Sequence, residues 1–120
     1  MIRILSVDMQ KNYICCLTVL TLKIIQTMFK VNEYFGGKVK SIAFENADGP
    51  ATIGVMAPGE YEFGTSTIEY MTVTSGALEV QLPGETKWKT YKPFETFVVP
   101  KDVKFRVKAE QDASYRCLYK

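Results

Sequence analysis

PGEYEFGTSTIEYMTVTSG, residues 58–76, is the stretch that decides the predicted fold of this 120-residue chain. Two runs within it alternate in character from one residue to the next, and Pro-Gly and Ser-Gly turns enclose them. Successive side chains of a β-strand point to opposite faces of the sheet, so every second residue shares a face. One face then carries Tyr61, Phe63 and Thr65 in the first run and Glu69, Met71 and Val73 in the second. The stretch therefore predicts two consecutive strands, each with one face turned to the interior.

The same two-residue period continues through the chain from residue 38 onward. Further runs cover residues 38–44, 51–56, 77–82, 94–99, 103–107 and 114–119, and Gly, Pro, Asn and Asp are common between them. About eight short strands with regularly spaced turns are typical of a sandwich or barrel. We expect an all-β, single-domain jelly roll with room for one small ligand, and a strand at 94–99 that is buried on both faces. An immunoglobulin-like sandwich is the alternative, but the Cys…Trp…Cys spacing of that fold is missing.

Charge and cysteine content exclude several classes of function. The net charge of +2 resides in residues 1–27, so the remainder is neutral and lacks the basic surface with which proteins bind nucleic acid polymers. The chain contains no histidine, and its three cysteines, Cys15, Cys16 and Cys117, include no CxxC pair. We therefore expect no metal ion and no other cofactor. Adjacent cysteines rarely bridge each other, so we expect a reducing, cytoplasmic location.

The N-terminal segment differs from the domain behind it. Residues 13–22, YICCLTVLTL, form an apolar run, but a membrane-spanning helix needs about 20 apolar residues. We predict no membrane partner, and no small-residue cleavage site of a signal peptide follows the run. Met28 opens MFKVNEYFGGKV, which would make a suitable start for the domain. We interpret residues 1–28 as an extension that is either not native or loosely attached, and residues 29–120 as the domain.

Residues 58–76 also resemble the first sequence motif of the cupin family. In that motif a glycine precedes two alternating histidines, then a glutamate and, six residues later, another glycine. Gly59, Glu69 and Gly76 hold the glycine and glutamate places here. The resemblance implies a cupin-like double-stranded β-helix, which is a small jelly-roll barrel.

Every histidine place of the cupin metal site is occupied by another residue type. Counting back from Glu69 puts the first two histidine places at Phe63 and Thr65, and counting forward from the glycine shifts them by two residues. The second cupin motif is resembled by FETFVVPKDVKFRV, residues 94–107, where the last histidine place is Phe105. One glutamate cannot hold a transition metal. The resemblance therefore implies a cupin pocket without its metal site.

Four separated blocks narrow the resemblance further. They are NEYFGGKVKSI (residues 32–42), VMAPGEYEF (55–63), MTVTSGAL (71–78) and SYRC (114–117). In this order and spacing they resemble the small cupin-type pyrimidine/purine nucleoside phosphorylases. The resemblance implies a pentosyltransferase of nucleotide salvage that cleaves many nucleosides with phosphate, without a metal, to a free base and ribose 1-phosphate. It also implies a homodimer.

Glu69 is the candidate catalytic residue. A carboxylate on the inward face of a strand costs free energy unless a ligand or a cation pairs with it. We expect Glu69 to accept hydrogen bonds from the ribose hydroxyls and to face the positive charge that develops at C1′ in an oxocarbenium-like transition state. A buried ion pair with a lysine is the alternative.

The other candidate ligands are aromatic, polar and basic residues on neighbouring strands. The candidate substrate-binding residues are Tyr61, Phe63, Thr65, Met71 and Phe105. Their rings and polar groups suit a base and a sugar, and the alternative is that they are ordinary core. The candidate phosphate ligands are Lys38, Lys40 and Arg106. For these cations an ordinary solvated strand face is the alternative.

The sequence leaves one other function open, a non-catalytic cupin module that binds a small sugar or nucleotide. Both functions use the same pocket, and they differ only in turnover. Phosphate-dependent release of a free base distinguishes the enzyme from the binding module.

Overall fold

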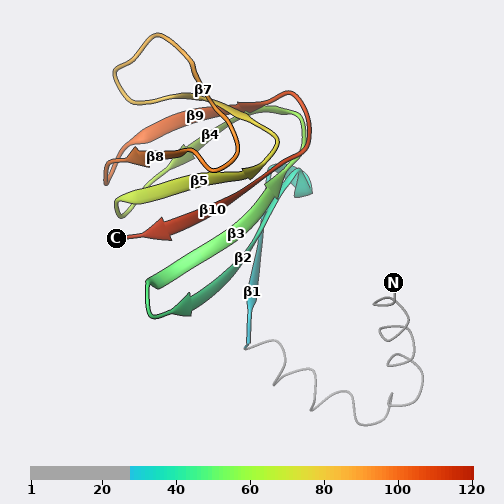
Figure 1. Ribbon diagram of the computed structural model, residues 1–120, viewed down its shortest axis with the longest axis vertical. Helices are drawn as coiled ribbons and strands as arrows, with labels where there is room; N and C mark the ends of the chain where they lie inside the picture. Colours follow the sequence, from blue (N-terminus) through green and yellow to red (C-terminus); the bar gives the residue numbers. More distant parts are fainter. Residues whose placement is uncertain (1–27) are drawn as a thin grey trace, which may run out of the picture. The chain divides into compact units, whose positions relative to one another are not determined.

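Residues 28–120, the part of the chain that the computed structural model describes, form ten β-strands and one 3-10 turn (Figure 1). The strands are β1 (Lys30–Tyr34), β2 (Val39–Asn46), β3 (Gly49–Met56), β4 (Gly59–Gly64), β5 (Glu69–Ser75), β6 (Leu78–Gln81), β7 (Lys89–Tyr91), β8 (Thr96–Val99), β9 (Lys104–Ala109) and β10 (Ala113–Tyr119), and the turn η1 is Phe35–Gly37. No helix within residues 28–120 has the length and hydropathy to cross a bilayer. The predicted extension, residues 1–28, lies outside this described part except for Met28.

The strands form two antiparallel sheets. Six strands form one sheet in the order β1-β2-β3-β10-β5-β8, and four form the other in the order β4-β9-β6-β7. The chain passes between the sheets several times, and the last strand, β10, pairs with both β3 and β5. Segments that are far apart in the sequence therefore lie side by side in the six-stranded sheet (Figure 1).

The predicted all-β architecture is confirmed, and each of the eight predicted runs overlaps one strand. The faces predicted to point inward do so, since Tyr61 on β4, Met71 and Val73 on β5, and Phe105 and Val107 on β9 are all buried. The structure adds β1 and β7, which lie at the edges of their sheets. Alternation in the sequence therefore fixed the inward faces but did not reveal these two edge strands.

The expectation that residues 94–99 are buried on both faces is wrong. Phe94 is 82% exposed and Val98 is 44% exposed, whereas Phe97 and Val99 are buried. β8 is an edge strand, and only one face of its sheet turns toward the interior. An apolar composition therefore did not mean burial on two sides.

The space between the sheets is packed solidly beside β6, β7 and β8. Buried apolar side chains fill it there, and we call this group the closed half: Leu78, Val80, Tyr91, Phe97 and Val99. The rings of Tyr91 and Phe97 are in contact, with centroids 4.8 Å apart. Beside β1 to β4, by contrast, the side chains leave a cavity.

Candidate active site

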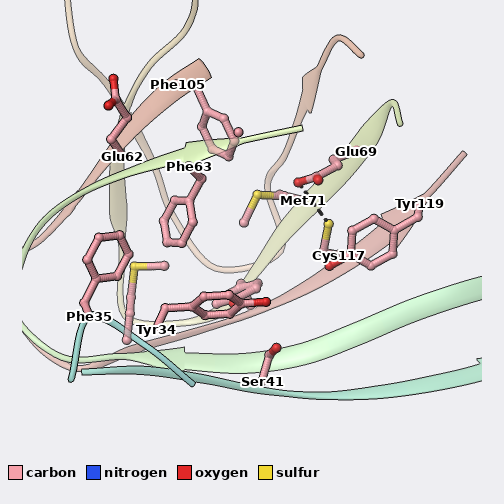
Figure 2. A pocket seen from close by; sticks show the side chains of 13 residues that line it. Tyr34, Phe35, Ser41, Glu62, Phe63, Glu69, Met71, Phe105, Cys117 and Tyr119 are labelled. Atoms are coloured by element: carbon pink, nitrogen blue, oxygen red, sulfur yellow. Dashed lines mark hydrogen bonds between the residues drawn. The ribbon is translucent and has the colours of Figure 1, made fainter. Parts of the chain in front are cut away.

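A cavity of about 290 Å³ opens between the two sheets (Figure 2). Its lining comes from η1 and from strands β1 to β5, β9 and β10, and none of it comes from the closed half. This volume is close to the lower limit of pockets that hold small organic ligands, about 300 Å³. The cavity is therefore large enough for one small ring compound.

Three phenylalanine rings form one side of the cavity, which we call the aromatic wall: Phe35, Phe63 and Phe105. The centroid of Phe63 lies 5.5 Å from that of Phe35 and 5.9 Å from that of Phe105. The planes of Phe35 and Phe63 are 89° apart, an edge-to-face arrangement that aromatic pairs favour. Tyr34 also stands perpendicular to Phe63, at 88° and 6.3 Å. This side of the cavity presents ring faces and edges.

The six-stranded sheet supplies the other side of the cavity, which we call the polar wall: Ser41, Glu69, Tyr115, Cys117 and Tyr119. Three of the five come from β10, where every second residue points inward. The register of the sheet sets Glu69 opposite Tyr119. Figure 2 shows Glu69, Cys117 and Tyr119 on one side of the cavity and Phe35 and Phe63 on the other.

Glu69 begins β5 at the polar wall and is partly buried. The Cys117 thiol donates a hydrogen bond to it, with Sγ 3.6 Å from Oε1 (dashed in Figure 2). Burial raises the pKa of the Glu69 carboxyl because a charge is poorly solvated there, and the Cys117 hydrogen bond opposes this shift. No lysine or arginine within residues 28–120 lines the cavity, and none pairs with Glu69. In this part of the chain, the expected alternative of a Glu69–lysine ion pair is therefore wrong.

The thiol and phenol groups beside Glu69 keep their protons at neutral pH. Burial raises the pKa of the Cys117 thiol and of the Tyr119 hydroxyl, and it raises the pKa of Tyr115 to about 12. The negative charge of Glu69 acts in the same direction on all three groups. The Tyr119 hydroxyl is fixed by the hydroxyl of Thr52, 2.9 Å away. The polar wall therefore combines one acidic group with neutral donors that suit the hydroxyls of a sugar.

Tyr115 lies close against β3 at Gly54, its partner in the ladder. A Cβ on Gly54 would lie 2.5 Å from both Cζ and the hydroxyl oxygen of Tyr115. Ser41 lines the cavity with Tyr115, and Asn32 Nδ2 donates to Ser41 Oγ at 3.2 Å. The absence of a side chain at Gly54 is therefore what lets Tyr115 occupy the polar wall.

The η1 turn brings Phe35 to the cavity in an uncommon backbone conformation. Phe35 has a φ of 54°, and Gly36 and Gly37 follow with φ of 68° and 91°. Positive φ is rare for a bulky residue and costs about 1–3 kcal/mol. The Phe35 ring packs against Tyr61, with centroids 5.0 Å apart, yet the residue remains 46% exposed.

Four of the predicted catalytic and substrate-binding residues line the cavity: Glu69, Phe63, Met71 and Phe105. Tyr61 on β4 and Thr65, which directly follows β4, are both buried but do not line the cavity. The Tyr61 hydroxyl donates to the carbonyl of Ala57 at 2.6 Å, and the Thr65 hydroxyl donates to that of Pro100 at 2.6 Å. Both hydroxyls thus join neighbouring segments of backbone. The binding roles of all six residues remain predictions.

The structure does not place the predicted phosphate ligands in the cavity lining. The Lys40 ammonium lies 3.6 Å from the carboxylate of Glu33, and the Arg106 guanidinium lies 2.8 Å from that of Glu60. Both pairs are largely exposed, and such pairs contribute little to stability. Lys38 is exposed and directly follows η1.

Nine residues of the cavity lining were not among the predicted site residues: Tyr34, Phe35, Ser41, Met56, Glu62, Gly64, Tyr115, Cys117 and Tyr119. The alternation of Tyr115, Cys117 and Tyr119 in SYRCLY is a signal that could have found the β10 side of the polar wall. Residues 32–37, NEYFGG, do not alternate between polar and apolar side chains. The sequence therefore gave no signal that β1 and η1 contribute to the cavity.

The donors at the cavity do not fit a metal ion. The histidine places of the cupin motifs hold Phe63, Thr65 and Phe105, which offer no ligand nitrogen. No group of three or more Cys, Asp or Glu side chains within residues 28–120 is close enough together to bind a metal. The chemistry of this site must therefore be sought in its carboxylate, hydroxyl and aromatic groups.

Structural comparison identifies the fold. A crystal structure of an RmlC-like cupin from Shewanella frigidimarina matches with a TM-score of 0.57 over 74% of this chain and 80% of that chain, at 16% identity. A crystal structure of a Vibrio parahaemolyticus protein of unknown function matches with a TM-score of 0.72 and 43% identity, over 74% of this chain and 95% of that one. The cupin-like jelly roll predicted from the sequence is thereby confirmed.

Sequence comparison identifies the family. A pyrimidine/purine nucleoside phosphorylase of Alcanivorax borkumensis is 63% identical over 92 residues, which are 77% of this chain and 98% of that protein. One from Pseudomonas putida is 59% identical over 93 residues, or 78% and 99% of the two chains. The model of the pyrimidine/purine nucleoside phosphorylase family matches residues 29–119. With a matching sequence over almost the whole domain and the predicted cupin-like fold, this chain belongs to the pyrimidine/purine nucleoside phosphorylase family.

Proposed function

We propose that this protein is a broad-specificity nucleoside phosphorylase, a pentosyltransferase that cleaves purine and pyrimidine nucleosides with inorganic phosphate. The products are a free base and ribose 1-phosphate. The observation that carries the proposal is the two-sided cavity, which offers aromatic rings on one side and a carboxylate with neutral donors on the other. A nucleoside has the same division, because its base is flat and its sugar carries hydroxyls. Membership of the family supports the same reaction.

In this reaction the bond from C1′ to the base nitrogen breaks and a bond from C1′ to a phosphate oxygen forms. The base leaves with the electron pair and takes up the proton that the attacking hydrogen phosphate releases, while C1′ gains positive charge in the transition state. Glu69 is the acidic group of the polar wall, and burial makes its charge more effective by limiting screening by water. Its proposed roles are to bind the ribose hydroxyls and to stabilise the charge at C1′.

Phosphate needs a cation or backbone N–H groups, and we propose Lys38 as its first ligand. Lys38 follows the turn that carries Phe35 to the cavity, and within residues 28–120 it forms no ion pair. Lys40 and Arg106 are paired with Glu33 and Glu60. We expect Lys38→Met to raise the KM for phosphate more than the KM for uridine, with Arg106→Met as the comparison. A larger increase of the KM for phosphate in Arg106→Met than in Lys38→Met would identify Arg106 as the phosphate ligand.

The test of the function is base release from uridine and adenosine by the purified protein, with and without phosphate. We expect free base and ribose 1-phosphate in equimolar amounts, and no release when phosphate is omitted. Separation of nucleoside and base by chromatography measures the first product, and phosphorus NMR identifies the second. Base release that does not depend on phosphate would contradict the proposal.

The non-catalytic module remains the alternative, and the same samples test it. Saturable binding of nucleoside by calorimetry without any product over hours would favour capture over catalysis. The cavity by itself would serve either function, and membership of the nucleoside phosphorylase family is what favours the enzyme.

We also propose that the protein is a homodimer formed through the outer face of the six-stranded sheet. Exposed apolar side chains gather there on β2, β3, β5 and β8: Ile42, Ile53, Val55, Tyr70 and Val98. Ile42 pairs with Ile53 and Tyr70 pairs with Val98, and the outward residues of β10, Arg116 and Leu118, lie between these two pairs on the same face. Exposed apolar side chains gathered on one face of a small protein mark an association surface. We expect light scattering to give twice the chain mass, and Ile53→Glu to give the monomer.

The place that we propose for this reaction is nucleotide salvage in the cytoplasm. Phosphorolysis conserves the energy of the glycosidic bond in a phosphate ester, and it returns a free base for reuse. The described part of the chain contains one cysteine, Cys117, which is a free, buried thiol. This thiol is consistent with a reducing compartment. Fractionation of cells followed by immunodetection of the protein would test the location.

A further inference from the structure

Phe35 is the one residue of the cavity wall that is bulky, largely exposed and held at a left-handed φ of 54°. The turn between β1 and β2 already contains two glycines with positive φ, and a third glycine would fit this backbone position without strain. A strained residue persists only where the surrounding structure enforces it, and such residues cluster at ligand sites. The position of the ring, rather than the course of the backbone, is therefore the feature to explain.

The ring of Phe35 is supported from behind and open in front. It packs at 5.0 Å against Tyr61 and edge-on at 5.5 Å against Phe63. Tyr61 is itself fixed by its hydrogen bond to the carbonyl of Ala57. With 46% of the residue still exposed, Phe35 is a positioned ring whose free surface borders the cavity.

The aromatic wall around Phe35 presents no side chain that could read the edge of a base. Its three members are phenylalanines, and the carboxylate and hydroxyl groups of the lining belong to the polar wall except those of Tyr34 and Glu62 (Figure 2). Glu62, which also lines the cavity, is one of the exposed residues of β4 that alternate with the inward-pointing Tyr61 and Phe63. Stacking on an aromatic ring tolerates every base, because purines and pyrimidines alike have a π-face.

We propose that Phe35 stacks on the nucleobase and is the residue that makes recognition depend on the face of the base and not on its edge. This places the base at the aromatic wall and directs C1′ and the ribose hydroxyls toward Glu69. The inference rests on the proposed function for its substrate class. It adds to that function a specificity-determining residue and the orientation of the nucleoside in the cavity.

The test compares three variants of the full chain, Phe35→Ala, Phe35→Tyr and Phe94→Ala. Phe94 is the matched control because it is also an exposed phenylalanine with a positive φ of 72°, but it does not line the cavity. We expect Phe35→Ala to raise the KM for uridine and for adenosine alike by about tenfold, since stacking on one ring has about this effect. The KM for phosphate should stay within about twofold of wild type, as a loss of stacking predicts. Phe35→Tyr should retain most of the affinity, and Phe94→Ala should match the wild type.

Two results would overturn the inference while leaving the proposed function intact: an unchanged KM in Phe35→Ala, or a KM raised for only one of the two nucleosides. Thermal melts of each variant establish that it is folded under the assay conditions. Should the wild type show no turnover, titration with adenine and uracil by calorimetry tests the stacking directly. Weaker binding of both bases by Phe35→Ala would then support Phe35 although the proposed function had failed, and equal binding would refute both.

Discussion

The closed half and the cavity are built from the same two sheets and differ in what the inward residues are. On β5, Val73 is fully buried and Met71 is nearly so, yet Glu69, the next residue on the same face, lies at the polar wall. β6, β7 and β8 add only apolar side chains to the interior. β1 to β4 and β10 add rings and polar groups around a space. The comparison teaches that stability and chemistry occupy different parts of one interior, so mutations should separate the two.

The largest effect is expected from Glu69→Gln. The variant keeps the shape of the side chain but removes the charge that we assign to the transition state. We expect kcat to fall by about 10²–10³-fold, the usual effect of removing one electrostatic contact of this kind. Steady-state rates with saturating uridine and phosphate measure the change. A fall of less than threefold would remove Glu69 from the mechanism.

The same substitution, Glu69→Gln, should raise the thermal stability of the protein although it lowers kcat. The pKa of Glu69 is raised in the folded protein, so ionisation of this carboxyl destabilises the folded state at a pH above this raised pKa. At a pH below the pKa of the unfolded state the carboxyl is protonated in both states, and this effect is absent. Removing the charge should therefore raise the thermal stability at pH 7 to 8 and have little effect near pH 4. Glu79→Gln on β6, away from the cavity, is the matched control and should show neither change.

The next largest effect is expected from Leu78→Ala in the closed half. Leu78 is fully buried, and truncation of such a side chain costs about 2–5 kcal/mol of the free energy of unfolding. Because Leu78 does not line the cavity, kcat measured well below the melting temperature should stay close to wild type. Urea denaturation and steady-state kinetics measure the two quantities. Phe94→Ala, which removes an exposed ring, should change stability by less than about 0.5 kcal/mol.

Gly54→Ala tests a position that should affect both the stability of the fold and the binding of substrate. The added Cβ would lie 2.5 Å from Tyr115, so the ring must move away from its place in the polar wall. We expect a loss of about 1–3 kcal/mol of stability, as for other overpacked sites, together with a raised KM for nucleosides. In the background of Tyr115→Leu the clash is relieved, so the stability cost of the alanine should largely disappear. An equal cost in both backgrounds would show that Tyr115 is not the reason for the glycine.

Alternation in the sequence was sufficient to predict which side chains point inward. Each strand has one face that is covered by the opposite sheet and one face that is not. Alternation assigned Phe63, Glu69, Met71 and Phe105 to the interior, and these residues line the cavity. It could not separate them from Tyr61, which shares the face of Phe63 but hydrogen bonds to the backbone. A face is a property of one strand, whereas the position of a cavity depends on how all the strands are ordered.

The remaining differences between the predicted and the observed site arise from the order of the strands in the sheets and from backbone geometry. β10 pairs with β3 and β5, and this sets Tyr119 opposite Glu69 and brings Tyr115 to the same wall of the cavity although about 50 residues separate β10 from Glu69 in the chain. Phe35 reaches the cavity only because the η1 turn has a positive φ at a non-glycine residue, which residue type alone would not predict. The burial expected for residues 94–99 failed because composition does not reveal which strand lies at an edge.

The smallest expected effect, and the sharpest test of the polar wall, comes from Cys117. Its thiol donates to Glu69 and thereby lowers the pKa of that carboxyl against the effect of burial. In Cys117→Ala this hydrogen bond is lost, so the pKa of Glu69 should rise further and the acid limb of the pH–rate profile should move to higher pH. Cys117→Ser keeps a donor and should leave the limb close to its wild-type position. A purely packing role for Cys117 would lower stability in both variants without moving the profile, so the direction of this shift distinguishes a residue that tunes Glu69 from one that only fills space.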